Sequence, residues 1–334
     1  MLAAVAKGSH VDQSKITVAE FVRTRIDHWE ASGSITVRTA ERYRQLAENQ
    51  IAPHLGAMVL QKLRPIHVEE WHTTLRTKGR ADGMGGVAPR TIGHAHRLLS
   101  QAISDAAENE LVVRNVVQTK SAPKVPARHM VIVQDVAAFI GMMKPNTRHY
   151  VTAMLSLFTG MRLGEVLALR WGRVDFDRKT ITVAEAIECT KLHGIRFKAP
   201  KTTAGRRVIT LPDFLVDVLR EHRKAQLELR LKLGLGKLQD GDLLFTDTDG
   251  EPLHPYHYGT LWSDYVERAG LPGLTFHCLR HSHASQLIDA GVDIVTISKR
   301  LGHATPTVTL NTYAHLFRKD DGKAAQAINA ALNS

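Results

Sequence analysis

Six side chains in the second half of the chain belong to types that together perform nucleophilic and acid–base chemistry. A tyrosine can attack phosphorus, arginines can bind phosphate oxygens, and histidine or lysine can transfer protons. Such a set could cut and rejoin a phosphodiester without a metal ion, so the residues indicate a reaction before they indicate a fold. The six residues are Arg162, Lys201, His277, Arg280, His303 and Tyr313.

Distinctive local strings surround five of these residues. His277 and Arg280 are three positions apart in FHCLRHSHAS, so a helix would place them on one face. Thr275 is placed to cap that helix, and helix N-termini attract phosphate. A lone tyrosine in a helix usually belongs to the core, but Tyr313 follows His303 by ten residues in LGHATPTVTLNTYAHLF, which favours a functional role. Arg162, in TGMRLGE, could also simply pair with the nearby Glu165.

These strings resemble those of the tyrosine recombinase (phage integrase) family, and especially the integrases of temperate phages and conjugative transposons. The resemblance covers about residues 15–334. It implies a mainly α fold with a small antiparallel β-sheet, arranged as a two-domain C-shaped DNA clamp with a SAM-like helical core-binding domain and a catalytic domain. It further implies a site-specific recombinase that integrates or excises a mobile element through a 3′-phosphotyrosine intermediate.

The resemblance also gives each of the six residues a role. Arginine suits phosphate because its planar guanidinium makes bidentate contacts. Tyrosine, with an ordinary pKa of about 10, needs help to lose its proton near neutrality. A cationic cluster can stabilise the transition-state charge, so no cofactor and no metal is expected. The implied roles are Tyr313 as nucleophile, Arg162 and Arg280 as phosphate ligands, His303 as a further hydrogen-bond donor, His277 as general base and Lys201 as general acid.

Two positions leave alternatives open. Lys198 lies three residues before Lys201 and could occupy the same space. The family usually has an aspartate where this chain has Cys278, which is either an inert buried side chain or a thiol made reactive by the neighbouring cations. A zinc site is not expected, because Arg280 would repel a metal and no glutamate completes a zincin pattern. The histidines that suggest such a site are His277, His281, His283 and His303.

Composition limits the class of protein. The 334 residues include 44 Lys and Arg against 33 Asp and Glu, giving a net charge of +11. This excess favours a nucleic-acid partner, although a merely basic protein would show it too. Two cysteines form no disulfide framework and fit a reducing cytosol. Without a signal peptide or an apolar run of about 20 residues, a cytoplasmic location without membrane contact is expected.

Composition and predicted secondary structure divide the chain into five segments. Residues 1–14 form a tail that resembles the connector after an arm-binding domain, and 15–115 form a helical core-type DNA-binding domain. Residues 116–128 form a basic linker, which either follows a phosphate backbone or is only a tether. Residues 129–320 form the catalytic domain, and 321–334 a C-terminal segment that could dock on a neighbouring protomer.

Caps, prolines and glycines predict the elements. In the first domain, Thr17 and Glu20 form a capping box, and four helices are expected, the second ending near Gln50 before Pro53. In the second domain, Gly160 separates two helices and Trp171 is expected in the core. Strands are predicted at 179–187 and 207–211 with a turn near 204–205, and helices at 212–233, 256–269, 274–290, 293–301 and 306–317.

The implied partners are double-stranded DNA attachment sites, bound by four protomers, with a host bending protein and an excisionase as further candidates. Two other functions stay open at this point. One is a Xer-like resolvase that acts with a partner recombinase. The other is a catalytically inactive or truncated DNA-binding protein that occupies attachment sites.

Overall fold

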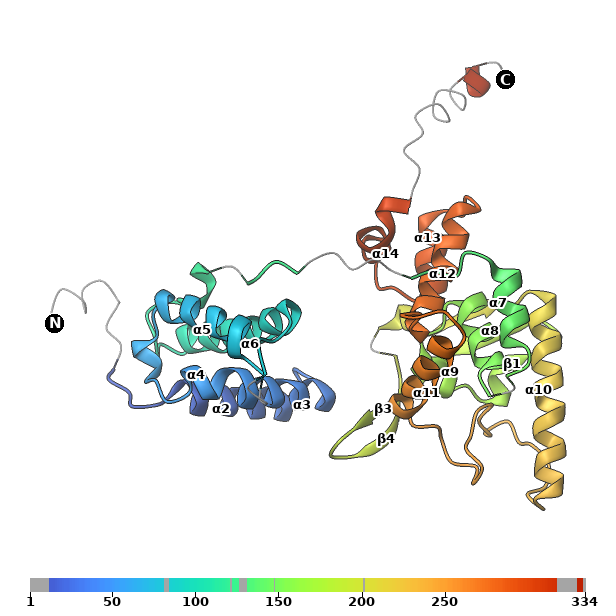
Figure 1. The fold of residues 1–334 in the computed structure, drawn as a ribbon, viewed down its shortest axis with the longest axis horizontal. Helices are drawn as coiled ribbons and strands as arrows, with labels where there is room; N and C mark the ends of the chain where they lie inside the picture. Colours follow the sequence, from blue (N-terminus) through green and yellow to red (C-terminus); the bar gives the residue numbers. More distant parts are fainter. Residues whose placement is uncertain are drawn as a thin grey trace. The chain divides into compact units, whose positions relative to one another are not determined.

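The computed structural model describes residues 12–80, 84–120, 122–125, 131–146, 148–200, 202–316 and 329–332. These residues fall into two compact units, divided between residues 128 and 129 (Figure 1). Helices dominate both units, and the strands form small antiparallel sheets in the second, as predicted. Within the described ranges, no helix combines the length and apolar character that a membrane span needs.

The first unit is a helical bundle around α6 (Pro89–Glu108), which contacts three other helices. The capping box is present, because the Thr17 hydroxyl accepts from Glu20 N and the Glu20 carboxylate accepts from Thr17 N at 2.9 Å. The buried Trp71 donates its indole N–H to the carbonyl of Gln50 at 2.7 Å. The other helices are α2 (Val18–Ala31), α3 (Val37–Leu46), α4 (Ala52–Leu55) and α5 (Pro65–Lys78).

One predicted boundary in this unit was wrong. The second helix does not end before Pro53, because a π-helical turn at Ala47–Ile51 carries the chain from α3 directly into α4. Pro53 is the second residue of α4, so the chain stays helical through a residue that has no backbone N–H to donate. A π turn takes one more residue per turn than an α turn, and tertiary contacts rather than local sequence decide where it occurs.

A pair of buried histidines lies inside the bundle. His72 Nε2 and His96 Nδ1 are 3.1 Å apart, and both residues are more than nine-tenths buried. Burial and the neighbouring His96 and Arg76 lower the pKa of His72 to about 4. The pair is therefore neutral at physiological pH and shares a single hydrogen bond.

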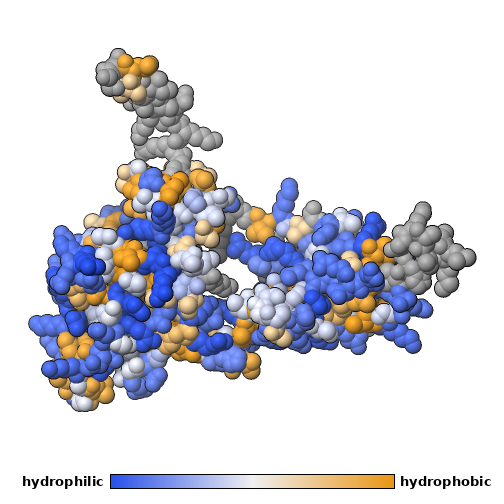
Figure 2. Space-filling view, turned by 180° about the vertical axis from the view of Figure 1, so that it is seen from behind, coloured by the Kyte–Doolittle hydropathy of each residue, from blue (hydrophilic) through white to orange (hydrophobic). Residues whose placement is uncertain are grey.

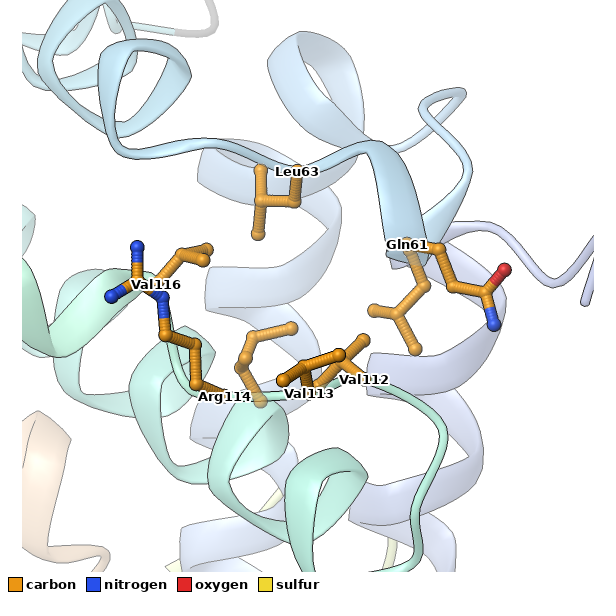
Figure 3. A pocket seen from close by; sticks show the side chains of 8 residues that line it. Gln61, Leu63, Val112, Val113, Arg114 and Val116 are labelled. Atoms are coloured by element: carbon orange, nitrogen blue, oxygen red, sulfur yellow. The ribbon is translucent and has the colours of Figure 1, made fainter. Parts of the chain in front are cut away.

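The segment after α6 packs back against residues 60–63 and leaves a hollow there of about 400 Å³, lined mostly by apolar side chains together with Gln61 and Arg114 (Figure 3). Gln61 ties the segments together by donating its amide to the carbonyls of Asp12 at 2.7 Å and Leu111 at 3.1 Å. Val117, farther along, is fully buried in the bundle core. Leu63 and Val112 are among the apolar side chains that Figure 3 shows around the hollow.

The second unit is built around α8 (Tyr150–Thr159), which is buried along nearly its whole length and contacts α7, α9, α10 and α12. A left-handed Gly160 ends α8, as predicted. Trp171 is buried, as expected, and donates its indole N–H to Gln226 at 2.7 Å. The remaining helices are α7 (Val136–Met143), α9 (Leu163–Leu167), α10 (Asp213–Lys232), α11 (Pro255–Arg268), α12 (Phe276–Asp289), α13 (Ile294–Leu301) and α14 (Pro306–Tyr313).

The strands differ from the prediction in one respect. The segment predicted as one strand over 179–187 is divided between two sheets. Its first half, β2, pairs with β1 and β5, with Ile181 opposite Ile209, whereas its second half begins the β3–β4 hairpin. β-Branched residues lie on both sides of the break and only Ala184 and Glu185 separate the two strands, with no glycine or proline to mark a boundary. The strands are β1 (Val174–Asp175), β2 (Thr180–Val183), β3 (Ala186–Thr190), β4 (Gly194–Lys198) and β5 (Arg207–Thr210).

The expected turn near residues 204–205 is a 3₁₀ turn, Thr203–Gly205, that leads into β5. Of the predicted C-terminal segment 321–334, only residues 329–332 are described, and they are helical. Hydrophilic residues dominate the face of the molecule in Figure 2, with apolar residues scattered among them.

Candidate active site

Arg162 stands at the junction of α8 and α9, where the backbone leaves little freedom. Gly160 has φ +70°, and a Cβ atom there would lie 2.7 Å from Leu301 Cδ2 and 2.8 Å from His283 Cδ2. Two residues later Arg162 caps the short helix α9. Its backbone N–H donates to Glu165 Oε2 at 3.0 Å and its Nη1 donates to Oε1 at 2.9 Å. Glu165 therefore fixes both the backbone and the guanidinium of Arg162.

Glu165 is itself held by a second arginine. The buried Arg207, at the start of β5, donates from Nη2 to Glu165 Oε2 at 2.9 Å and from Nε to the carbonyl of Arg300 at 2.7 Å. Burial alone would raise the pKa of Glu165, but Arg207 and Arg162 lower it below its usual value. One carboxylate thus joins α9 to β5, and Arg207 joins β5 to the end of α13.

Arg280 is the most deeply buried cation of the group, with an exposed fraction of 2%. It projects from α12 and donates from Nη1 to the carbonyl of Gly160 at 2.6 Å. Its Nη2 is one of three buried side-chain nitrogens in the described part of the chain that have no hydrogen-bond partner. Burial and the charge of Arg162 lower the pKa of Arg280 to about 9, so the guanidinium is still charged near neutrality.

The two predicted histidines share this environment. Burial and the nearby His281, Arg280 and Arg162 lower the pKa of His277 to about 4. The pKa of His303 also falls to about 4, through burial and then through Arg280 and Arg162. Both rings are therefore neutral at physiological pH. The His303 ring is held by a 2.7 Å hydrogen bond between Nδ1 and the hydroxyl of Thr309, which leaves Nε2 for another partner.

Tyr313 is the last residue of α14 and is almost fully buried. Its hydroxyl lies 2.7 Å from His281 Nδ1. Burial raises the pKa of Tyr313 to about 12, although the charges of Arg280 and Arg162 act in the opposite direction. These interactions place Arg162, which immediately precedes α9, and Arg280 and His281 of α12 around the phenol that α14 contributes.

The structure thus brings together five of the six predicted residues. The sixth, Lys201, lies outside the described residues. Its rival, Lys198, forms an ion pair with Glu188 across the β3–β4 hairpin. Cys278 is buried, with its sulfur 3.1 Å from the hydroxyl of Thr275. The converging residues are Arg162, His277, Arg280, His303 and Tyr313.

Three further residues of the site were given no role in the reaction from the sequence. Arg207 and Thr309 orient Glu165 and His303, and His281 contacts the tyrosine directly. Only His281 carried a usable signal, because it lies one helical turn after His277. No group of three or more histidine, cysteine or acidic side chains that could hold a metal is found among the described residues.

The site therefore combines charged hydrogen-bond donors, neutral histidines and a phenol. Comparison with known proteins identifies the family. The profile of the phage integrase family matches residues 132–320. The chain belongs to the phage integrase family. The profile of the N-terminal SAM-like domain of phage integrases matches residues 22–76 of this integrase. The resemblance inferred from the sequence is confirmed, and the chain is a tyrosine recombinase, an enzyme of the class that cuts and rejoins DNA.

Individual relatives of the integrase span most of its length. A tyrosine recombinase XerC-like protein of Caldanaerobacter subterraneus subsp. tengcongensis is 25% identical, over 97% of this chain and 86% of the relative. The integrase of Mycobacterium phage L5 is 26% identical, over 89% of this chain and 75% of the relative. The Tn1549 transposon integrase, solved in complex with a circular intermediate DNA, superposes with a TM-score of 0.79 at 20% identity, over 95% of this chain and 99% of that one.

Proposed function

We propose that this integrase cuts double-stranded DNA at an attachment site by attack of Tyr313 on a phosphate. The attack forms a 3′-phosphotyrosine and frees a 5′-hydroxyl, and a 5′-hydroxyl then attacks the phosphotyrosine to restore a phosphodiester. The phosphodiester energy is kept in the covalent bond, so no ATP is needed. The observation that carries the proposal is the buried phenol of Tyr313 within the electrostatic reach of two arginines.

The arginines would bind the non-bridging oxygens of the scissile phosphate. Arg280 has a buried Nη2 ready to donate, and Glu165 holds the guanidinium of Arg162 in a fixed orientation. His303, neutral and oriented through Nδ1, would donate from Nε2 to the same phosphate. Fixed donors of this kind stabilise the charge that develops in the transition state without reorganisation. The family resemblance gives the general-acid role to Lys201 and the general-base role to His277.

Because Tyr313 is almost fully buried, the scissile phosphate must reach this cluster before the bond can form. The relatives whose structures contain DNA support DNA as the partner of this chain. Four protomers on two sites, with strands exchanged in pairs, would complete a recombination reaction. Docking of residues 321–334 on a neighbouring protomer would couple the active sites, and a host bending protein and an excisionase remain candidate partners.

A covalent adduct tests the central step. DNA segments from either side of the gene that encodes this chain serve as candidate sites, each with a nick just past the expected cleavage point so that the freed end diffuses away. The wild-type chain should give a protein–DNA adduct on a denaturing gel. Tyr313→Phe keeps the ring and its packing but should give none. Clear DNA binding without an adduct in the wild type would refute the proposal and indicate a DNA-binding protein that no longer cleaves.

A further inference from the structure

We propose that His281, rather than His277, takes the proton from the Tyr313 hydroxyl as this oxygen attacks the phosphate. The inference rests on the proposed function of Tyr313 as nucleophile. Its basis is a direct contact, because His281 Nδ1 lies 2.7 Å from the phenolic oxygen. A general base must be within hydrogen-bond distance of the proton that it removes, and His281 meets this requirement in the DNA-free protein.

The fold fixes this contact from both sides. His281 lies one turn after His277 on α12, and the two rings meet edge to face with centroids 4.6 Å apart. On its other side the His281 ring meets Tyr313, with centroids 5.6 Å apart. Tyr313 packs against buried residues of α12 and α13, including Ala284 and Leu301. The phenol therefore cannot move far without breaking apolar contacts.

The electrostatic surroundings keep His281 in the form that a base requires. Burial and the charge of Arg280 lower its pKa, so near neutrality the ring is uncharged and one nitrogen has a free lone pair. With its proton on Nε2, the ring accepts the hydrogen bond from Tyr313 through Nδ1. The titratable and charged groups around this pair are His277 and Arg280 on α12, and Arg162 at the start of α9, which acts on both His277 and Tyr313.

Tyr313 cannot ionise by itself. With a pKa of about 12, roughly one phenol in a hundred thousand would be ionised at pH 7. The nucleophile must therefore lose its proton while the new bond forms. The nearby arginines disfavour a charged His281 in the free protein, but the negative charge that gathers on the phosphate in the transition state offsets this penalty.

Each bond and each proton in the reaction has a defined origin and destination, in cleavage and in rejoining. In cleavage the bond from Tyr313 Oη to phosphorus forms, the bond from phosphorus to the 5′ oxygen breaks, and the phenolic proton moves to His281 Nδ1. The leaving 5′ oxygen receives a proton from the general acid of the proposed mechanism. In rejoining, a 5′-hydroxyl attacks phosphorus and returns its proton to the general acid, while Tyr313 leaves and takes its proton back from His281.

Two variants separate proton transfer from simple positioning. His281→Asn places an amide near the position of Nδ1, so it can still hold the Tyr313 hydroxyl but cannot take the proton. His281→Ala removes both functions. The measurement is the single-turnover rate of adduct formation on the nicked DNA, from pH 6.5 to 9.5, with the DNA affinity and melting temperature of each variant measured alongside. His277→Asn is the rival variant, because the family resemblance gives the general-base role to His277; a rate that rises tenfold per pH unit in His277→Asn but not in His281→Asn would overturn the inference.

Both His281 variants should form the adduct about 10²–10⁴-fold more slowly than the wild type at pH 7.5, with DNA affinity unchanged. Their rates should rise about tenfold per pH unit as hydroxide replaces the missing base, so the difference from the wild type narrows in alkali. A His281→Asn rate within about threefold of the wild type would overturn the inference, because a hydrogen bond alone would then suffice.

A substrate with sulfur in place of the 5′ oxygen supplies the second readout, because a thiolate leaves without needing a proton. Loss of a base at Tyr313 should not be rescued by this substrate, whereas loss of the general acid, as in Lys201→Ala, should be. Rescue of His281→Asn by the sulfur substrate would show that His281 serves the leaving group, which also overturns the inference. Failure of the wild-type chain itself to form an adduct would instead refute the proposed function, and the inference with it.

Discussion

Replacing Glu165 by Gln should destabilise the second unit strongly while leaving its shape intact. Glutamine keeps the size of the side chain but removes the charge that faces Arg207 at 2.9 Å and Arg162 at 2.9 Å. The Arg207 side chain is only 6% exposed, so its charge would stay buried without an anionic partner. Removing one partner of a buried ion pair costs about 3–5 kcal/mol.

The expected change in melting temperature follows from this free energy. The amide of glutamine can still accept one hydrogen bond, so the lower limit of about 3 kcal/mol is the appropriate figure. For a domain of this size, each kcal/mol corresponds to about 2–4 °C, which gives a decrease of roughly 6–12 °C. Differential scanning calorimetry of the whole chain should show this decrease in the transition of the second unit. The transition of the first unit should not move.

Two controls make this prediction specific. Asp217→Asn removes the carboxylate from an exposed ion pair with Arg220 on α10 of the same unit, and should change stability by less than about 0.5 kcal/mol. The dependence of stability on acidic pH provides the second control. Because the pKa of Glu165 lies below its ordinary value of 4.5, its ionised form stabilises the fold above that pH, and this contribution disappears as the pH falls further. The Gln variant should therefore lose less stability than the wild type on acidification.

The reasoning would be refuted by a Glu165→Gln variant whose second unit melts within about 2 °C of the wild type, since 1 kcal/mol already corresponds to that shift. An equal shift in both units would also contradict it, because the effect would then not arise from the local pair.

Gly160→Ala should destabilise the second unit by about 1–3 kcal/mol, because the added Cβ would overlap two side chains and the backbone is left-handed. Gly291→Ala, also left-handed but with open space around the Cβ, is the matched control in chemical denaturation, and an equal loss at both sites would contradict the packing argument. The first unit should lose stability as the pH falls from 6.5 towards 4, because the unfolded chain binds a proton that the buried His72 does not accept until about pH 4. His72→Gln should flatten this dependence in thermal melts of the first unit between pH 7.5 and 5, and an unchanged slope would exclude His72 as its source.

The sequence was most informative where local rules decide the structure. The capping box at Thr17, the break at Gly160 and the helix start at Pro306 depend on a few neighbouring residues, and all three are present in the structure. The π turn before Pro53 could not be predicted, because its position depends on contacts such as the bond from Trp71 to the carbonyl of Gln50.

The candidate site likewise contains residues that the sequence predicted and residues that it did not. The distinctive strings identified the residue types that converge, because each string has its own characteristic pattern. Arg207 gave no signal, because its role depends on a carboxylate 42 positions away in the sequence, and the contact between His281 and Tyr313 spans 32 positions. Such pairs become visible only when α9, β5, α12 and α14 are placed in space. The role of Lys201 stays a prediction.

The unpartnered Nη2 of Arg280 has a consequence for the stability of the whole catalytic unit. A buried donor without an acceptor lowers stability by about 1–3 kcal/mol, so the free protein is less stable than its packing alone would allow. A phosphate oxygen that accepts from this nitrogen would remove that penalty. Binding of the scissile phosphate and folding of the second unit would therefore be thermodynamically linked through one guanidinium. The same nitrogen that lowers the stability of the DNA-free protein would make the DNA-bound protein the more stable form.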